Sequence, residues 1–168
     1  DGGLIYTSED VNAPATITVA EDSGIYTNGT FFTTLNTGAS DESAQKLTFV
    51  VTTDNPSLFS VQPAISATGG LTFTPAANAN GSGKITVVSV TDDGGTANGG
   101  VNTSVPTPRN EVQVVITPVN DAPTQGAVAV AGTEDTVVSF TSAAFTAGYN
   151  IGHPDSPVRP AVNYTIES

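Results

Sequence analysis

The chain has 168 residues, of which 16 are acidic and four are basic, so its formal net charge at pH 7 is −12. So acidic a chain offers no cationic surface to phosphate groups, which excludes nucleic acid and disfavours anionic membrane surfaces as partners. It has no cysteine and no apolar run of the length that crosses a membrane, so thiol chemistry is excluded and no membrane span is expected.

Short runs of alternating apolar and polar residues predict β-strands along the chain. Residues 4–6 read as the last strand of a preceding unit. Alternation over residues 46–51, 71–74 and 111–116 predicts strands with one face in a core. Residues 85–90 are almost continuously apolar, which predicts a central strand covered on both faces. Helical periodicity is missing over any useful length, so the sequence predicts an all-β fold.

Turn sequences separate these strands, at residues 54–56, 67–70, 80–81 and 92–95. The longest connection, from Asp92 to Asn110, is rich in glycine and proline, and loops of this length are usually functional. Asp92 and Asp93 adjoin, but neighbours on a strand point to opposite faces, so we expect a turn role beside Gly94 rather than a catalytic pair. The one histidine, His153, is expected in a loop, and we predict that the protein is not an enzyme.

A short sequence pattern occurs twice and indicates tandem repeats. Residues 11–14 (VNAP) precede Glu21, and residues 119–123 (VNDAP) precede Glu134, with about one β-sandwich domain between the two copies. Because the chain has no methionine, we expect it to be a processed product or a piece of a longer protein. The expected organisation is a tail strand and linker of a preceding unit (1–13), a complete sandwich repeat (14–118), a linker (119–123) and the incomplete head of a next repeat (124–168).

Several sequence strings resemble one family. Residues 86–95, 112–117 and 118–123 resemble the final two strands and the linker of cadherin repeats. The likeness is closer to bacterial cadherin-like or immunoglobulin-like tandem repeats, whose familiar strings also occur at residues 54–60, 71–76 and 96–100. The resemblance implies an immunoglobulin/cadherin-like Greek-key β-sandwich. It also implies a large secreted or surface-anchored bacterial protein, and therefore an extracellular location.

The resemblance further implies calcium at the junctions between repeats, where linker and domain oxygens meet. Ca²⁺ takes six to eight hard oxygen ligands, and an ion bridging two domains would stiffen the array. Carried over by position, the C-terminal junction would use Glu21, Asn120, Asp121 and Asp155, and the N-terminal junction Asn12, Asp41 and Glu42.

The linker also departs from the cadherin pattern, which lowers the number of available acids. Pro118 stands where cadherins have Asp, Ala122 stands where they have Asn, and Ala13 follows Asn12 without an intervening Asp. Any calcium site is therefore expected to be weak. The alternative is that these Asn and Asp residues make only turn and linker hydrogen bonds while proline rigidifies the hinge.

The expected function is structural: spacing, adhesion or matrix building by a non-enzymatic surface module whose partner is itself. One version is an array of repeats in series. In another, residues 1–10 of one copy complete the C-terminal unit of the next by strand complementation, which gives an open head-to-tail filament. The alternative is a module that binds carbohydrate or a cell-surface receptor through the loop at residues 92–110, with Tyr26 or Tyr149 as stacking residues.

Overall fold

The computed structural model describes residues 14–33, 35, 37, 43–97, 101–105, 110–122, 124–125, 135 and 149–150. The chain divides into two compact units, Asp1–Pro118 and Val119–Ser168. Within the described residues both units are built from strands, with a short 3-10 helix, η2 (Pro56–Leu58), in the first.

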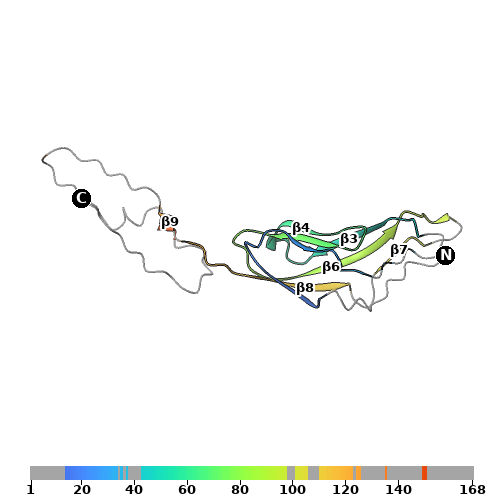
Figure 1. Ribbon diagram of the computed structural model, residues 1–168, viewed down its shortest axis with the longest axis horizontal. Helices are drawn as coiled ribbons and strands as arrows, with labels where there is room; N and C mark the ends of the chain where they lie inside the picture. Colours follow the sequence, from blue (N-terminus) through green and yellow to red (C-terminus); the bar gives the residue numbers. More distant parts are fainter. Residues whose placement is uncertain are drawn as a thin grey trace. The chain divides into compact units, whose positions relative to one another are not determined.

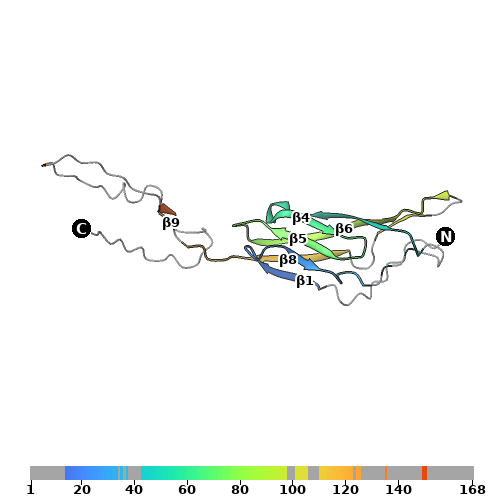
Figure 2. The same cartoon turned by 45° about the horizontal axis from the view of Figure 1, so that its top comes forward.

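The first unit contains two open β-sheets that enclose one core (Figures 1 and 2). This arrangement is an all-β sandwich, as the sequence predicts. The larger sheet has the order β1 (Thr16–Ala20), β8 (Glu111–Thr117), β6 (Gly81–Asp92), β3 (Leu47–Thr53), with β7 (Thr103–Ser104) also paired to β6. The smaller sheet has the order β2 (Tyr26–Asn28), β5 (Leu71–Pro75), β4 (Phe59–Ile65).

The alternating sequences form strands with one buried face, which confirms those predictions. Leu71 and Phe73 on β5 are fully buried, and Thr72 between them is half-buried on the other side. On β8 the residues Val114 and Ile116 are buried in the same way. Because side chains alternate across a pleated strand, each strand contributes every second residue to the core.

The prediction that residues 85–90 are covered on both faces is wrong. This part of β6 is central, between β8 and β3, but only its inner side is buried, and Val88 on the outside is 44% exposed. Val50 pairs with Ser89 and Val51 with Val87, so Val88 is one extra residue in β6. This β-bulge changes the alternation, and the apolar run arises from the bulge rather than from burial on two sides.

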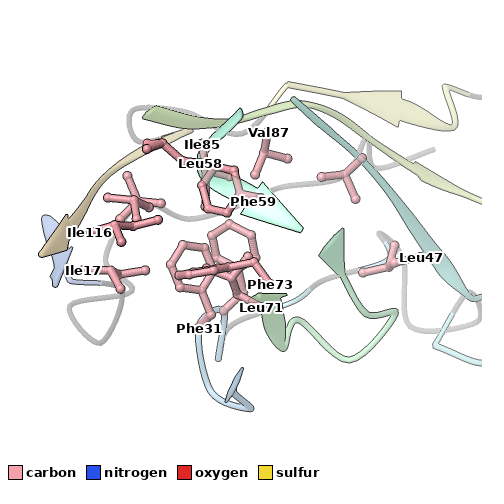
Figure 3. Close-up of a cluster of buried hydrophobic side chains, with 14 residues drawn as sticks. Ile17, Phe31, Leu47, Leu58, Phe59, Leu71, Phe73, Ile85, Val87 and Ile116 are labelled. Carbon is pink, nitrogen blue, oxygen red and sulfur yellow. The ribbon is translucent and has the colours of Figure 1, made fainter. Parts of the chain in front are cut away.

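The core is centred on packed aromatic rings (Figure 3). Phe59 and Phe73 lie edge to face with ring centroids 5.3 Å apart, between Ile85 and Val87 on one side and Leu71 on the other. Pairs of this geometry contribute about 0.5–1.5 kcal/mol beyond the area they bury. The rings therefore join side chains of the two sheets into a single cluster.

The first strand of the sandwich runs parallel to the last. Thr16 pairs with Gln113 and Ala20 pairs with Thr117, and the two strands lie side by side in Figure 2. Since both strands run in the same direction, β1 begins beside the start of β8 and ends beside the end of β8. The start of β1 and the end of β8 are therefore at opposite ends of this strand pair.

The second unit is described over two short strands. β9 (Thr124–Gln125) pairs antiparallel with β10 (Tyr149–Asn150). The tail predicted at residues 1–13 and most of the head predicted at residues 124–168 lie outside the described residues, so that organisation stays a prediction.

Candidate functional site

The structure describes some of the residues expected to bind calcium. Glu21, Asn120 and Asp121 are described. The other expected ligands, Asn12, Asp41, Glu42 and Asp155, lie outside the described residues.

Glu21 lies at the end of the first unit from which the chain leaves. It follows β1 directly and is 2% exposed. Its N–H donates to the carbonyl oxygen of Thr117 (3.1 Å), and the hydroxyl of Thr117 donates to the carbonyl oxygen of Val19 (3.3 Å). These bonds join the ends of β1 and β8, and a buried carboxylate at such a place is costly to desolvate unless its oxygens are satisfied. Glu21 is thus the buried acid at this end of the sandwich, and its replacement tests whether a carboxylate is needed there.

The linker residues belong to the second unit and have their own hydrogen bonding. Asn120 is exposed, and its Nδ2 donates to the carbonyl oxygen of Asp121 (3.4 Å). This bond is one of the linker hydrogen bonds that these residues would make if they did not bind calcium. Among the residues that the structure describes, no group of three or more acidic, histidine or cysteine side chains is placed to hold a metal ion. Calcium binding therefore stays a prediction.

The corner after β6 confirms the expected turn role of its first aspartate. Asp92 is 8% exposed, and its Oδ1 accepts a hydrogen bond from the Gly94 N–H (2.9 Å). The Oδ1 of Asp93 accepts one from the Lys46 N–H (2.9 Å). The two carboxylates hold backbone groups, and the second one fastens the start of β3 to the end of β6, a contact that sequence alone did not reveal.

A small charged cluster lies on the outer side of the larger sheet. The Lys84 Nζ donates to the Glu111 Oε2 (2.9 Å), and the Lys84 N–H donates to the Asp54 Oδ1 (2.6 Å). The hydrogen bond that Lys84 donates to Glu111, together with the negative charge of Glu111, raises the pKa of Lys84. Both side chains of this ion pair are nearly half exposed, so it adds little stability. Lys84 and Glu111 meet diagonally across two strands, a contact that only the strand register brings about.

One of the two tyrosines expected to stack on a carbohydrate is packed against the core. The ring of Tyr26 stacks on Phe73, with centroids 4.7 Å apart and planes at 19°. One face of Tyr26 is therefore covered, which leaves it poorly suited to stack on a sugar. The side chain of Tyr149 lies outside what is described. The described part of the loop carries two exposed apolar residues, Val101 and Val105.

Comparison with known proteins gives no relative from which a function could be carried over. No family model matches the chain, and no curated protein or solved structure matches it significantly. Across the described part of the chain, no helix has the length and apolar character needed to cross a membrane.

Proposed function

We propose that this chain is a non-enzymatic structural module of an extracellular bacterial surface or matrix protein, in which sandwich units are joined in series and carry tension. The observation that supports this proposal is the parallel pairing of β1 with β8. It puts the start of β1 and the end of β8 at opposite ends of the strand pair, so units joined in series through these two strands would add length.

The same pairing gives the unit a direction in which it resists load. When the chain is pulled from both sides, β1 and β8 are drawn in opposite directions along their own axes. The pairs from Thr16–Gln113 to Ala20–Thr117 are then loaded together. Two further bonds extend the row, from the Gln113 N–H to the Ala15 oxygen (3.2 Å) and from the Glu21 N–H to the Thr117 oxygen (3.1 Å). Breaking all of them at once requires more force than breaking them singly.

The strand order supports an immunoglobulin/cadherin-like Greek-key sandwich, the fold that the sequence resemblance implies. Such folds place strands B, E and D in one sheet and C, F and G in the other. Taking β2, β5 and β4 as B, E and D, and β3, β6 and β8 as C, F and G, reproduces this division, with β1 added beside the last strand.

Composition supports an extracellular place for such a module. The chain is strongly acidic, and an excess of one charge keeps a secreted protein soluble. A sandwich of this size has enough core to fold without disulfides. Its partners would be neighbouring repeats or other copies of itself.

The series arrangement is tested by imaging. Chains of one, two and four fused copies would be examined by electron microscopy, and the contour length is expected to grow in proportion to copy number. Compact particles whose longest dimension does not grow would contradict the proposal. Filaments formed by the single copy, and lost when residues 1–10 are deleted, would identify strand complementation as the way in which copies join.

Calcium at the exit end is tested through Glu21. If it is a ligand, Ca²⁺ should raise the melting temperature of the wild-type chain, and Glu21→Gln should remove this response because a neutral amide binds the ion more weakly. Glu111→Gln, which changes an exposed acid on β8, is the matched control and should keep the response. An equal response in wild type and Glu21→Gln would exclude Glu21 as a ligand.

A further inference from the structure

The strand β3 forms one edge of the larger sheet. Within the described residues, β3 pairs with β6 on one side and with no strand on the other. The N–H of Asp92 donates to the oxygen of Asn102 (3.0 Å), and that of Val87 donates to the oxygen of Asn110 (2.7 Å), both away from β3. On β3, Leu47 is paired with Asp92 and Val51 with Val87. These are non-hydrogen-bonded pairs of the antiparallel ladder, so the peptide groups of Leu47 and Val51 face the open side.

The peptide groups of β3 alternate between β6 and the open edge. The residues that flank β3 direct their N–H groups toward the β6 side. The Lys46 N–H donates to the Asp93 Oδ1 (2.9 Å), and the Asp54 N–H donates to the Lys84 carbonyl oxygen (3.2 Å). The bulge at Val88 is in β6, so β3 itself stays regular. The residues whose N–H and C=O groups face outward are Leu47, Phe49, Val51 and Thr53.

This edge lacks the features that usually block strand addition. The sequence of β3, LTFVVTT, contains no proline and no charge. By contrast β4, an edge strand of the smaller sheet, carries Pro63 and two register shifts. Because the chain has a net charge of −12, two copies approach with least repulsion along an uncharged strand.

We propose that β3 is a self-association edge, at which the β3 strands of two copies pair antiparallel across a two-fold axis at Val50. Phe49 then lies opposite Val51, and Leu47 opposite Thr53, so the outward peptide groups of one copy bond to those of the other. The 47% exposed side chain of Val50 is covered by its own counterpart. The pairing is isologous and closes at two copies, unlike head-to-tail addition.

Charge complementarity selects this register. Lys46 and Asp54 flank β3 at equal distances from Val50, and both are exposed, so each Lys46 meets the Asp54 of the other copy. A one-residue slip would place residues whose peptide groups face outward opposite residues whose peptide groups face β6, so the two strands could not form hydrogen bonds. A two-residue slip would place Lys46 opposite Thr52 or Pro56 and lose both ion pairs.

The test combines sedimentation of the full chain with amide hydrogen exchange at increasing concentration. The expected result is a dimer in which the amides of Leu47, Phe49, Val51 and Thr53 become protected only as the dimer forms. Those of Thr48, Val50 and Thr52 should be protected in the monomer already. This alternation is specific to pairing at the edge.

Three variants test the register. Val50→Lys puts like charges opposite one another and should raise the dimer dissociation constant several-fold. Val88→Lys makes the same change at a similarly exposed valine on the next strand and should leave the constant unchanged. Lys46→Glu should also raise the constant several-fold, because it sets two acids opposite one another at each end of the paired strands.

The proposal would be overturned by a chain that stays monomeric at millimolar concentration with its outward amides exchanging freely. It would also be overturned by a dimer that Val50→Lys leaves intact, or that Val88→Lys weakens equally. Both valines are exposed, so the lysine variants should melt within a few degrees of the wild type and remain folded for the measurement.

Discussion

At the scale of single residues, stability is concentrated in the aromatic contacts of the core. Phe73 is fully buried and contacts the rings of both Tyr26 and Phe59. It lies on β5, the middle strand of the smaller sheet. No other described side chain combines complete burial with two ring contacts.

Replacing Phe73 by alanine should therefore lower the free energy of unfolding by about 3–5 kcal/mol, through lost transfer free energy and the cavity left behind. Urea unfolding measures this loss. Val61→Ala, on the neighbouring strand β4 at a 57% exposed position, should change stability by less than about 0.5 kcal/mol. Comparable losses for both variants would show that the described core is not what stabilises the unit.

At the scale of elements, the β4–β5 hairpin depends on a glycine for two separate reasons. Gly69 has φ +85°, and a Cβ there would lie 2.5 Å from the carbonyl oxygen of Phe32. The Gly69 oxygen also accepts the Phe32 N–H (3.0 Å), which holds the segment before β3 against the hairpin. Gly24 has a similar φ of +75° but open space around it.

These two glycines form a matched pair that separates backbone strain from steric contact. Gly24→Ala should cost about 1–2 kcal/mol, because a left-handed conformation is unfavourable for a residue with a Cβ. Gly69→Ala should cost a further ~1–3 kcal/mol, because its Cβ also overlaps Phe32. Thermal unfolding of both variants measures the difference, and equal losses would mean that the hairpin shifts away from Phe32 without cost.

The elements also show which features the sequence could predict. The period-two pattern identified β3, β5 and β8, because alternation records which side of a strand is buried. It misjudged β6, because a bulge at Val88 brings apolar residues together without burying both faces. The stacking of Tyr26 on Phe73, the Lys46–Asp93 bond and the Lys84–Glu111 pair depend on strand register, which separate segments of sequence do not specify.

The candidate calcium residues illustrate the same limit. The position of Glu21 in the repeat pattern predicted that it is a calcium ligand, and the structure places it buried beside the end of β8. The sequence could not show that its N–H is bonded to Thr117. That bond requires β1 and β8 to be parallel neighbours, although almost the whole unit separates them along the chain.

At the scale of the whole molecule, the parallel arrangement of β1 and β8 makes mechanical resistance depend on the direction of pulling. Load applied across the two ends of the first unit shears the row of hydrogen bonds. Load applied to the start of β1 and the start of β8 peels the same bonds apart one after another. Because the chain has no cysteine, handles can be attached at introduced cysteines alone.

The most direct measurement of the proposed role is single-molecule pulling of one chain in these two geometries. Cysteines at Ala15 and Pro118 give the shear geometry, and cysteines at Ala15 and Glu111 give the peeling geometry, with all three positions exposed. A load-bearing repeat should unfold at a clearly higher force in shear than in peeling. Equal forces in the two geometries would contradict the account, because the β1–β8 pairing would then not be what carries tension.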